Sequence, residues 1–147
     1  MRFRAAIVLA IGFQLTYGAV FAHHSFPSEF DNTIAVTVRG VVTSVEVVNP
    51  HSFIYIDVET DGAVERWALE GPGATQIARR GLEIKLMKAG DELGACGYLA
   101  RRDVVPTRPE PGTARPARKL QAAVLLRPNR EPLLWSNYRQ GRCGLDT

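Results

Sequence analysis

The three histidines of the chain fall into two short motifs. His23 and His24 stand together in AHHSFPSEFD, and His51 follows a proline in VNPHSF. Imidazole nitrogens suit copper, and a histidine at a chain terminus can add its own amine nitrogen to its ring nitrogen. If processing makes His23 the first residue, its amine and ring form a three-nitrogen set with the ring of His51. The pattern therefore predicts a copper site of His23, His24 and His51, in which His24 is adjacent or an alternative ligand.

The alternative interpretation of the histidines needs no metal. A histidine after proline can cap a turn through a ring N–H, and a histidine pair at a new N-terminus can simply fray. Because proline restricts both itself and the preceding Asn49, we expect the backbone to fix the direction of His51. Four carboxylates are candidate oxygen ligands or acceptors for the imidazoles, and spacing selects none of them: Glu29, Asp31, Glu46 and Asp57.

No set of residues in the sequence forms a hydrolytic site. No serine lies in a nucleophile elbow, and the sequence has neither a phosphate-binding glycine loop nor a zinc-protease helix motif. Ser52 adjoins His51, but neighbouring residues of a strand point to opposite faces, so they make a poor nucleophile and base. We therefore assign no catalytic residue. An enzyme, such as a copper-dependent oxidase, would depend on the metal.

The chain begins with a pattern typical of a secretory signal peptide. Arg2 and Arg4 precede a short apolar run, and Val20 and Ala22 supply a small-residue cleavage site, so we expect cleavage of residues 1–22. A membrane anchor is the rival interpretation, but the apolar core is short for about 30 Å of hydrocarbon. The expected location is periplasmic or secreted, with no stable membrane anchor after cleavage.

After the leader, residues 23–135 have the pattern of one small β domain, and residues 136–147 follow as a C-terminal tail. The apolar alternation of the first strand changes phase around Gly40. A glycine at a phase change predicts a bulge or bend, which lets a small sheet curl into a barrel. Asp61-Gly62 predicts a two-residue hairpin between the second and third strands.

A short helix and further strands complete the pattern. ATQIARRG predicts a helix that ends at Gly81; LGACGYLA and LQAAVLLRP predict two more strands, and PLLWS a short partner. Residues 101–119 are rich in proline and arginine and are expected to form a mobile loop. The order predicts a mainly all-β fold, a five- to six-stranded OB-like barrel with one short helix between strands three and four. An immunoglobulin-like sandwich is the rival, but the helix counts against it.

The two cysteines, Cys96 and Cys143, match no metal-binding spacing. In an exported chain an even number of cysteines predicts a disulfide, because the compartment is oxidising. This bond would attach the tail to the domain. The alternative is a buried Cys96 with an unpaired Cys143.

Charge is divided along the chain, since acidic residues predominate over 23–98 and basic residues over 99–147. The basic end is interpreted as a solvated segment that balances an acidic domain, and the alternative is that it meets an acidic partner. No aromatic residues are interleaved with the basic ones, so we expect no nucleic acid among the partners. The expected partner is an unknown small ligand or a periplasmic protein.

Three stretches together resemble a known family: AHHSFPSEFD, VTVRGVVTSVEVVNPHSFIYIDV and ARRGLEIKLMKAGDEL. They are similar to a family of small secreted or periplasmic bacterial proteins of unknown function, whose members begin with a His-His-Ser-Phe stretch and carry an Asn-Pro-His turn. The resemblance covers about residues 23–99 and, more weakly, 120–126. It implies a periplasmic location and a barrel, and no established activity. The long proline-rich loop, the extended tail and the two cysteines depart from the family pattern.

Two functions of different classes follow from these observations. The first is a periplasmic barrel that binds copper through the amine and ring of His23 and the ring of His51, in copper handling or delivery. The second is a metal-free ligand- or protein-binding barrel that uses exposed aromatics such as Phe53, Tyr55 and Trp67. Binding of the second kind would ignore chelators.

Overall fold

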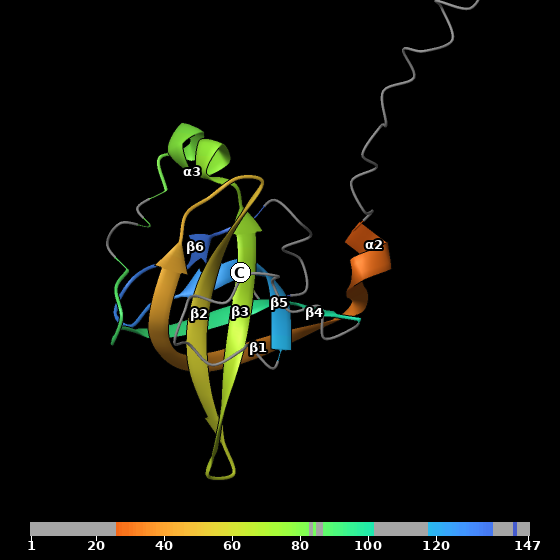
Figure 1. The fold of residues 1–147 in the computed structure, drawn as a ribbon, viewed down its shortest axis with the longest axis vertical. Coiled ribbons are helices and arrows are strands. Elements are labelled where there is room, and N and C mark those ends of the chain that lie inside the picture. Colours follow the sequence, from red (N-terminus) through yellow and green to blue (C-terminus); the bar gives the residue numbers. More distant parts are fainter. Residues whose placement is uncertain (1–25, 83, 85–86, 102–117, 137–142, 144–147) are drawn as a thin grey trace, which may run out of the picture.

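The structure is a computed structural model, and it describes residues 26–82, 84, 87–101, 118–136 and 143. The elements follow in the order α2 (Phe26–Glu29), β1 (Phe30–Glu46), β2 (His51–Thr60), β3 (Ala63–Pro72), α3 (Ala74–Arg80), β4 (Glu92–Ala100), β5 (Arg118–Leu126) and β6 (Leu133–Leu134) (Figure 1).

The strands close into a barrel. Their order in the sheet is β3-β2-β1-β4-β5-β6, and an additional pairing of β3 with β5 joins the two ends. In that pairing Trp67–Glu70 of β3 runs parallel to Arg118–Gln121 of β5. The other neighbours are antiparallel, and β6 is a short sixth strand on β5. The fold is therefore mainly β, a closed five-stranded barrel with an extra strand and with α3 between β3 and β4, as the sequence predicts.

β1 is long and strongly curved, as Figure 1 shows. A Cβ atom on Gly40 would stand 2.3 Å from the carbonyl oxygen of Asp57, so only glycine allows β2 to approach this closely. The pairing of β1 with β2 changes register between Val42 and Ser44. The bend expected from the sequence is thus present, but the phase change lies just after Val42 rather than at Gly40.

The hairpin turn and the helix end that the sequence predicts are both present in the structure. Asp61 and Gly62 connect β2 to β3 with φ values of 51° and 79°, the left-handed conformations of a tight two-residue hairpin turn. Gly81 ends α3 with a φ of 62°, and its backbone N–H bonds back to the carbonyl of Ala78.

The hydrophobic core fills the barrel and one end of it. Trp135 is fully buried, and a Cβ atom on Gly71 would come 1.8 Å from the Trp135 indole nitrogen, so Gly71 makes room for this ring. Trp67 also belongs to the core at 8% exposure, which corrects the expectation that it is an exposed binding aromatic. The core comprises Val42, Ile54, Ile56, Val58, Trp67, Leu69, Ile77, Ile84, Met87, Leu93, Ala95, Leu120, Ala122, Leu125 and Trp135.

Several expectations fall on residues that the structure does not describe. They include the predicted leader 1–22, most of the predicted loop 101–119 and most of the predicted tail 136–147. β5 begins at Arg118, so Arg118 and Lys119, which the sequence assigns to the loop, are strand residues. Within the described ranges, no helix is long and apolar enough to cross a membrane.

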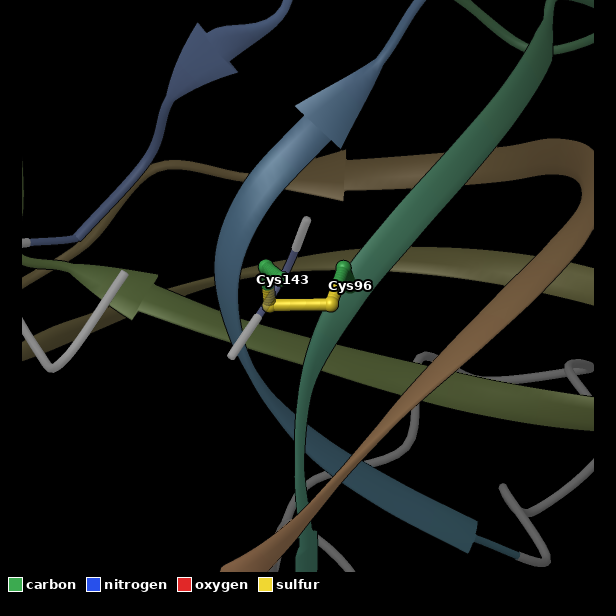
Figure 2. The surroundings of a disulfide bond; sticks show 2 residues. All are labelled: Cys96 and Cys143. Atoms are coloured by element: carbon green, nitrogen blue, oxygen red, sulfur yellow. A yellow bond between two sulfur atoms is a disulfide. The ribbon is translucent and has the colours of Figure 1, made fainter. Parts of the chain in front are cut away.

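Cys96 of β4 and Cys143 of the tail form a disulfide, with their Cα atoms 5.6 Å apart (Figure 2). The bond joins residues separated by 47 positions in the sequence. The predicted pairing is confirmed, and the alternative with an unpaired Cys143 is wrong.

Candidate functional site

The Asn49-Pro50-His51 turn is attached to the start of α3. The Asn49-Pro50 peptide bond is cis. The side-chain oxygen of Asn49 accepts the backbone N–H of Thr75 at 3.2 Å, and its amide donates to the Thr75 hydroxyl at 3.2 Å. Gly73 at the N-cap offers no side-chain hydrogen bond, so Asn49 supplies a cap from another segment. This attachment fixes the point at which His51 begins β2.

His51 is paired with a buried carboxylate. Its Nδ1 atom lies 3.0 Å from Oε1 of Glu70, and the side chains are 49% and 5% exposed, respectively. Across the β2–β3 hairpin His51 pairs with Pro72 and Glu70 pairs with Phe53, so His51 and Glu70 are diagonal neighbours on one face. A carboxylate at Nδ1 favours the tautomer with its proton on that atom and leaves Nε2 as the ligand atom.

Glu70 belongs to a row of charged side chains on the outside of the barrel. The Nζ atom of Lys119 lies 2.6 Å from Oε2 of Glu70 and 2.5 Å from Oε1 of Glu29, and the Lys119 side chain is only 8% exposed. Burial lowers the pKa of Lys119, but the carboxylates of Glu70 and Glu29 outweigh it, so the net effect is a raised pKa. The row therefore links His51 on β2, Glu70 on β3, Lys119 on β5 and Glu29 on α2.

The residues that follow His23 and His24 in the N-terminal motif are anchored to the barrel. The ring of Phe26 stacks on Phe30 with centroids 5.2 Å apart, and it meets Tyr98 of β4 edge-on at 5.8 Å. Arg101 donates from its Nε atom to the carbonyl of Pro27 at 3.0 Å. These contacts hold α2 against the outer face of β4 and β5.

A row of paired residues crosses the strands between this anchor and His51. Tyr98 pairs with Gln121, Gln121 with Glu70, and Glu70 with Phe53. Since neighbouring strands lie about 4.8 Å apart, the row spans about 14 Å. Phe26 lies at one end of it, and the His51 end of β2 lies at the other.

A pocket of about 310 Å³ opens beside His51. Arg80 donates from its two terminal nitrogens to the carbonyls of Trp135 at 2.8 Å and Leu134 at 2.7 Å. The lining residues come from the turn, β3, α3, β5 and the C-terminal segment: Pro50, His51, Gly71, Pro72, Gln76, Arg80, Gln121 and Ser136.

A larger hollow of about 490 Å³ lies elsewhere, and among the described residues of the predicted site only Asp57, one of the four candidate carboxylates, lines it. Arg39, Val41, Glu59, Val64 and Glu92 are among its lining residues. The candidate site is therefore the smaller pocket, because it alone of the two contains His51.

The structure describes one member of the predicted metal set, His51; His23 and His24 lie outside the described residues. In the ranges that are described, no three His, Cys, Asp or Glu side chains are grouped so as to hold a metal ion. The carboxylates considered from the sequence have other partners: Glu29 binds Lys119, Asp31 accepts from Thr33, Glu46 accepts from Tyr55, and Asp57 pairs with Arg66.

The sequence reasoning missed Glu70, which is the acceptor that His51 uses. The signal that could have found it is the Asp61-Gly62 turn, because a two-residue hairpin loop sets the register of both strands. From the pair of Thr60 with Ala63 beside the turn, this register continues along both strands and places Glu70 opposite Phe53 and diagonal to His51.

The aromatic surface expected for a metal-free barrel is not formed as predicted. Trp67 lies in the core, and Tyr55 is only 7% exposed, with its hydroxyl 3.2 Å from a carboxylate oxygen of Glu46. Phe53 is half-buried beside Tyr55, with ring centroids 6.2 Å apart. Barrel closure explains Trp67, because it turns that phase of β3 inward. Tyr55 lies on the other phase, together with Phe53, and is covered there by neighbours that include Glu46.

The family described as "Family of unknown function (DUF6152)" matches residues 13–105 of the chain. No curated protein matches this chain. Among solved structures, the crystal structure of a small single-stranded DNA-binding protein from Streptomyces coelicolor is similar, with 17% identity and a TM-score of 0.40, over 66% of this chain and 95% of that chain.

This last comparison corrects one expectation about partners. Nucleic acid was excluded because no aromatic residues are interleaved with the basic ones. That exclusion is withdrawn, because the similar structure is that of a single-stranded DNA-binding protein. At a TM-score of 0.40 this likeness assigns no nucleic acid to this chain.

Proposed function

This chain belongs to DUF6152, a family of unknown function, and from that premise we propose a function on the site alone: a periplasmic barrel that binds copper(II), for copper handling or delivery. The proposed ligands are the amine and ring of His23 and the Nε2 atom of His51, with His24 adjacent. The observation that carries the proposal is the 3.0 Å contact between His51 Nδ1 and Glu70.

The chemistry of this contact suits a metal ligand. A carboxylate behind a histidine ring fixes its tautomer and orientation and makes the opposite nitrogen a better donor. Glu70 is itself fixed by burial and by Lys119, while His51 remains half exposed to an incoming ion. Nitrogen ligands favour copper among the divalent metals, and amines and imidazoles lose their protons at little cost near neutral pH.

The dimensions of the barrel also support the proposal. Phe26 is anchored beside Tyr98, about 14 Å across the strands from Phe53. The three residue steps from Phe26 back to His23 span at most about 10 Å when extended, and a histidine side chain adds several ångströms. His51 lies two residues, or about 7 Å, beyond Phe53 on β2. His23 therefore reaches the site only with this segment extended and with the side chain of His51 spanning the remaining distance.

The test is a copper(II) titration of the exported protein, with its own N-terminus, against a competing chelator. We expect His51→Ala to weaken copper binding, and we expect the same when one alanine is inserted before His23, because the insertion converts only the amine into an amide. Gln76→Ala, a change in the same pocket that removes no metal ligand, serves as the control. If both test variants bind copper as tightly as the native protein, the histidines share no site and a metal-free binding barrel becomes the better interpretation.

A further inference from the structure

We propose that the pocket beside His51 is a site for a small carboxylate-bearing ligand, recognised by the guanidinium of Arg80 with Gln76 and Gln121. The pocket is built from segments that are far apart in the sequence: the turn before β2, α3, β5 and Ser136. The proposal does not rest on copper, and it concerns a different ligand.

Arg80 is the charged group of the pocket for which the described part of the chain supplies no counter-ion. A guanidinium has five N–H donors, and Arg80 uses one from each terminal nitrogen on the carbonyls of Leu134 and Trp135. Among the residues that the structure describes, no carboxylate pairs with it. Its three remaining donors suit the planar, two-oxygen geometry of a carboxylate. Because the two existing bonds already hold the guanidinium, little side-chain freedom is left to lose on binding.

Two further polar residues of the lining are buried. Gln121 and Ser136 are each 4% exposed. The Gln121 amide donates once, to the carbonyl of Glu70 at 3.3 Å, which leaves its oxygen and a second N–H for another partner. Gln76 lies four residues before Arg80 on α3, so both side chains stand on the same face of that helix.

The carboxylate of Glu70 does not oppose an anion in this pocket. Glu70 is not a lining residue, and its two oxygens contact His51 and Lys119. The pocket volume of about 310 Å³ is at the lower end for small-molecule sites. A compact carboxylate therefore fits the charge and the size of the site better than a nucleotide does.

The experiment uses the full mature protein in the presence of a chelator, so that its result is independent of copper. The probes are succinate, the uncharged analogue succinamide and inorganic phosphate, each titrated by calorimetry. We expect saturable binding of succinate, no binding of succinamide, and weaker binding of phosphate. Absence of succinate binding, or tighter binding of phosphate than of succinate, overturns the proposal.

Three variants locate the site. Arg80→Gln removes the charge and Gln76→Glu adds a repelling one, so each is expected to weaken succinate binding by at least about tenfold. Arg79→Gln is the matched control, because Arg79 is exposed on α3 and does not line the pocket. If Arg80→Gln does not fold, the exposed Gln76→Glu carries the test. Equal weakening by Arg79→Gln, or none by Gln76→Glu, contradicts the assignment.

Discussion

His51 and Glu70 are diagonal neighbours across the β2–β3 hairpin, with Nδ1 of the histidine 3.0 Å from Oε1 of the carboxylate. The ring of His51 is half exposed and can meet a ligand, whereas the carboxylate of Glu70 is buried. The contact therefore joins an accessible imidazole to a buried charge. Lys119 continues the connection to Glu29 of the N-terminal motif. The two histidine-bearing motifs of the sequence are thus linked by Glu70 and Lys119, which belong to neither motif.

Replacing Glu70 with glutamine is expected to lower copper affinity by about 10- to 100-fold, because the ring of His51 loses the carboxylate that orients it. Competition with a chelator measures the change. Glu65→Gln is the control, since Glu65 lies on the same strand, is 44% exposed and pairs with Arg118 instead. Unchanged affinity in Glu70→Gln would show that this carboxylate does not position the ring.

Replacing Lys119 with methionine is expected to reduce the free energy of unfolding by about 3–5 kcal/mol, because it leaves the buried carboxylate of Glu70 without its cation. Urea denaturation measures the loss. Arg118→Met is the neighbouring control, since the Arg118–Glu65 pair is about half exposed and such pairs contribute at most about 1 kcal/mol. Equal losses of unfolding free energy in the two variants would show that the buried pair of Lys119 and Glu70 contributes no more to stability than the exposed pair of Arg118 and Glu65.

Asp31 is expected to titrate below its ordinary pKa of 3.8. The main cause is the Thr33 hydroxyl, 2.6 Å from Oδ1, followed by the Thr33 backbone N–H at 2.9 Å; burial acts in the opposite direction, and the charge of Arg101 has the smallest effect. A lowered pKa in the folded protein stabilises it above pH 3.8, and this contribution is lost as pH falls through the folded value.

The test of the Asp31 prediction is a carboxyl titration by nuclear magnetic resonance. Thr33→Val removes the largest cause and is expected to raise the pKa of Asp31. Arg101→Gln removes the smallest one and is expected to raise it less. The reverse order would mean that charge, and not hydrogen bonding, lowers this pKa.

The Cys96–Cys143 bond is expected to stabilise the exported protein by roughly 2–4 kcal/mol, because it restricts the unfolded chain. Non-reducing peptide mapping should recover one peptide pair that contains both cysteines. A reductant should lower the melting temperature of the native protein and leave that of a Cys96→Ser/Cys143→Ser double variant unchanged. Two free thiols in protein purified from the periplasm would count against the bond.

The exported protein is expected to begin at His23, because Val20 and Ala22 supply the small-residue pattern that signal peptidases cleave. Intact-mass measurement of protein purified from the periplasm checks this. A retained leader would leave His23 without a free amine and would remove one nitrogen from the proposed copper set.

The sequence by itself determined the strands of the barrel, the helix α3 and their order, whereas α2 at Phe26–Glu29 was not predicted. The alternation of β1, the Asp61-Gly62 turn and the Gly81 helix end are local signals, and each acts within a few residues of chain. The cysteine pair was also readable, because only one intramolecular disulfide can form between two cysteines. These features depend on backbone preferences and on the residues present, which need no knowledge of distant contacts.

Tertiary structure decided which side chains meet. The pairing of β3 with β5 brings Glu70 beside Lys119, although about fifty residues separate them, and α3 brings Arg80 to the carbonyls of Leu134 and Trp135. Closure also turned Trp67 into the core. The physical reason is that contacts across a barrel depend on strand register and on the closure of the sheet. An alternating pattern specifies which residues share a face, but not which face becomes the interior or which strand lies next to it.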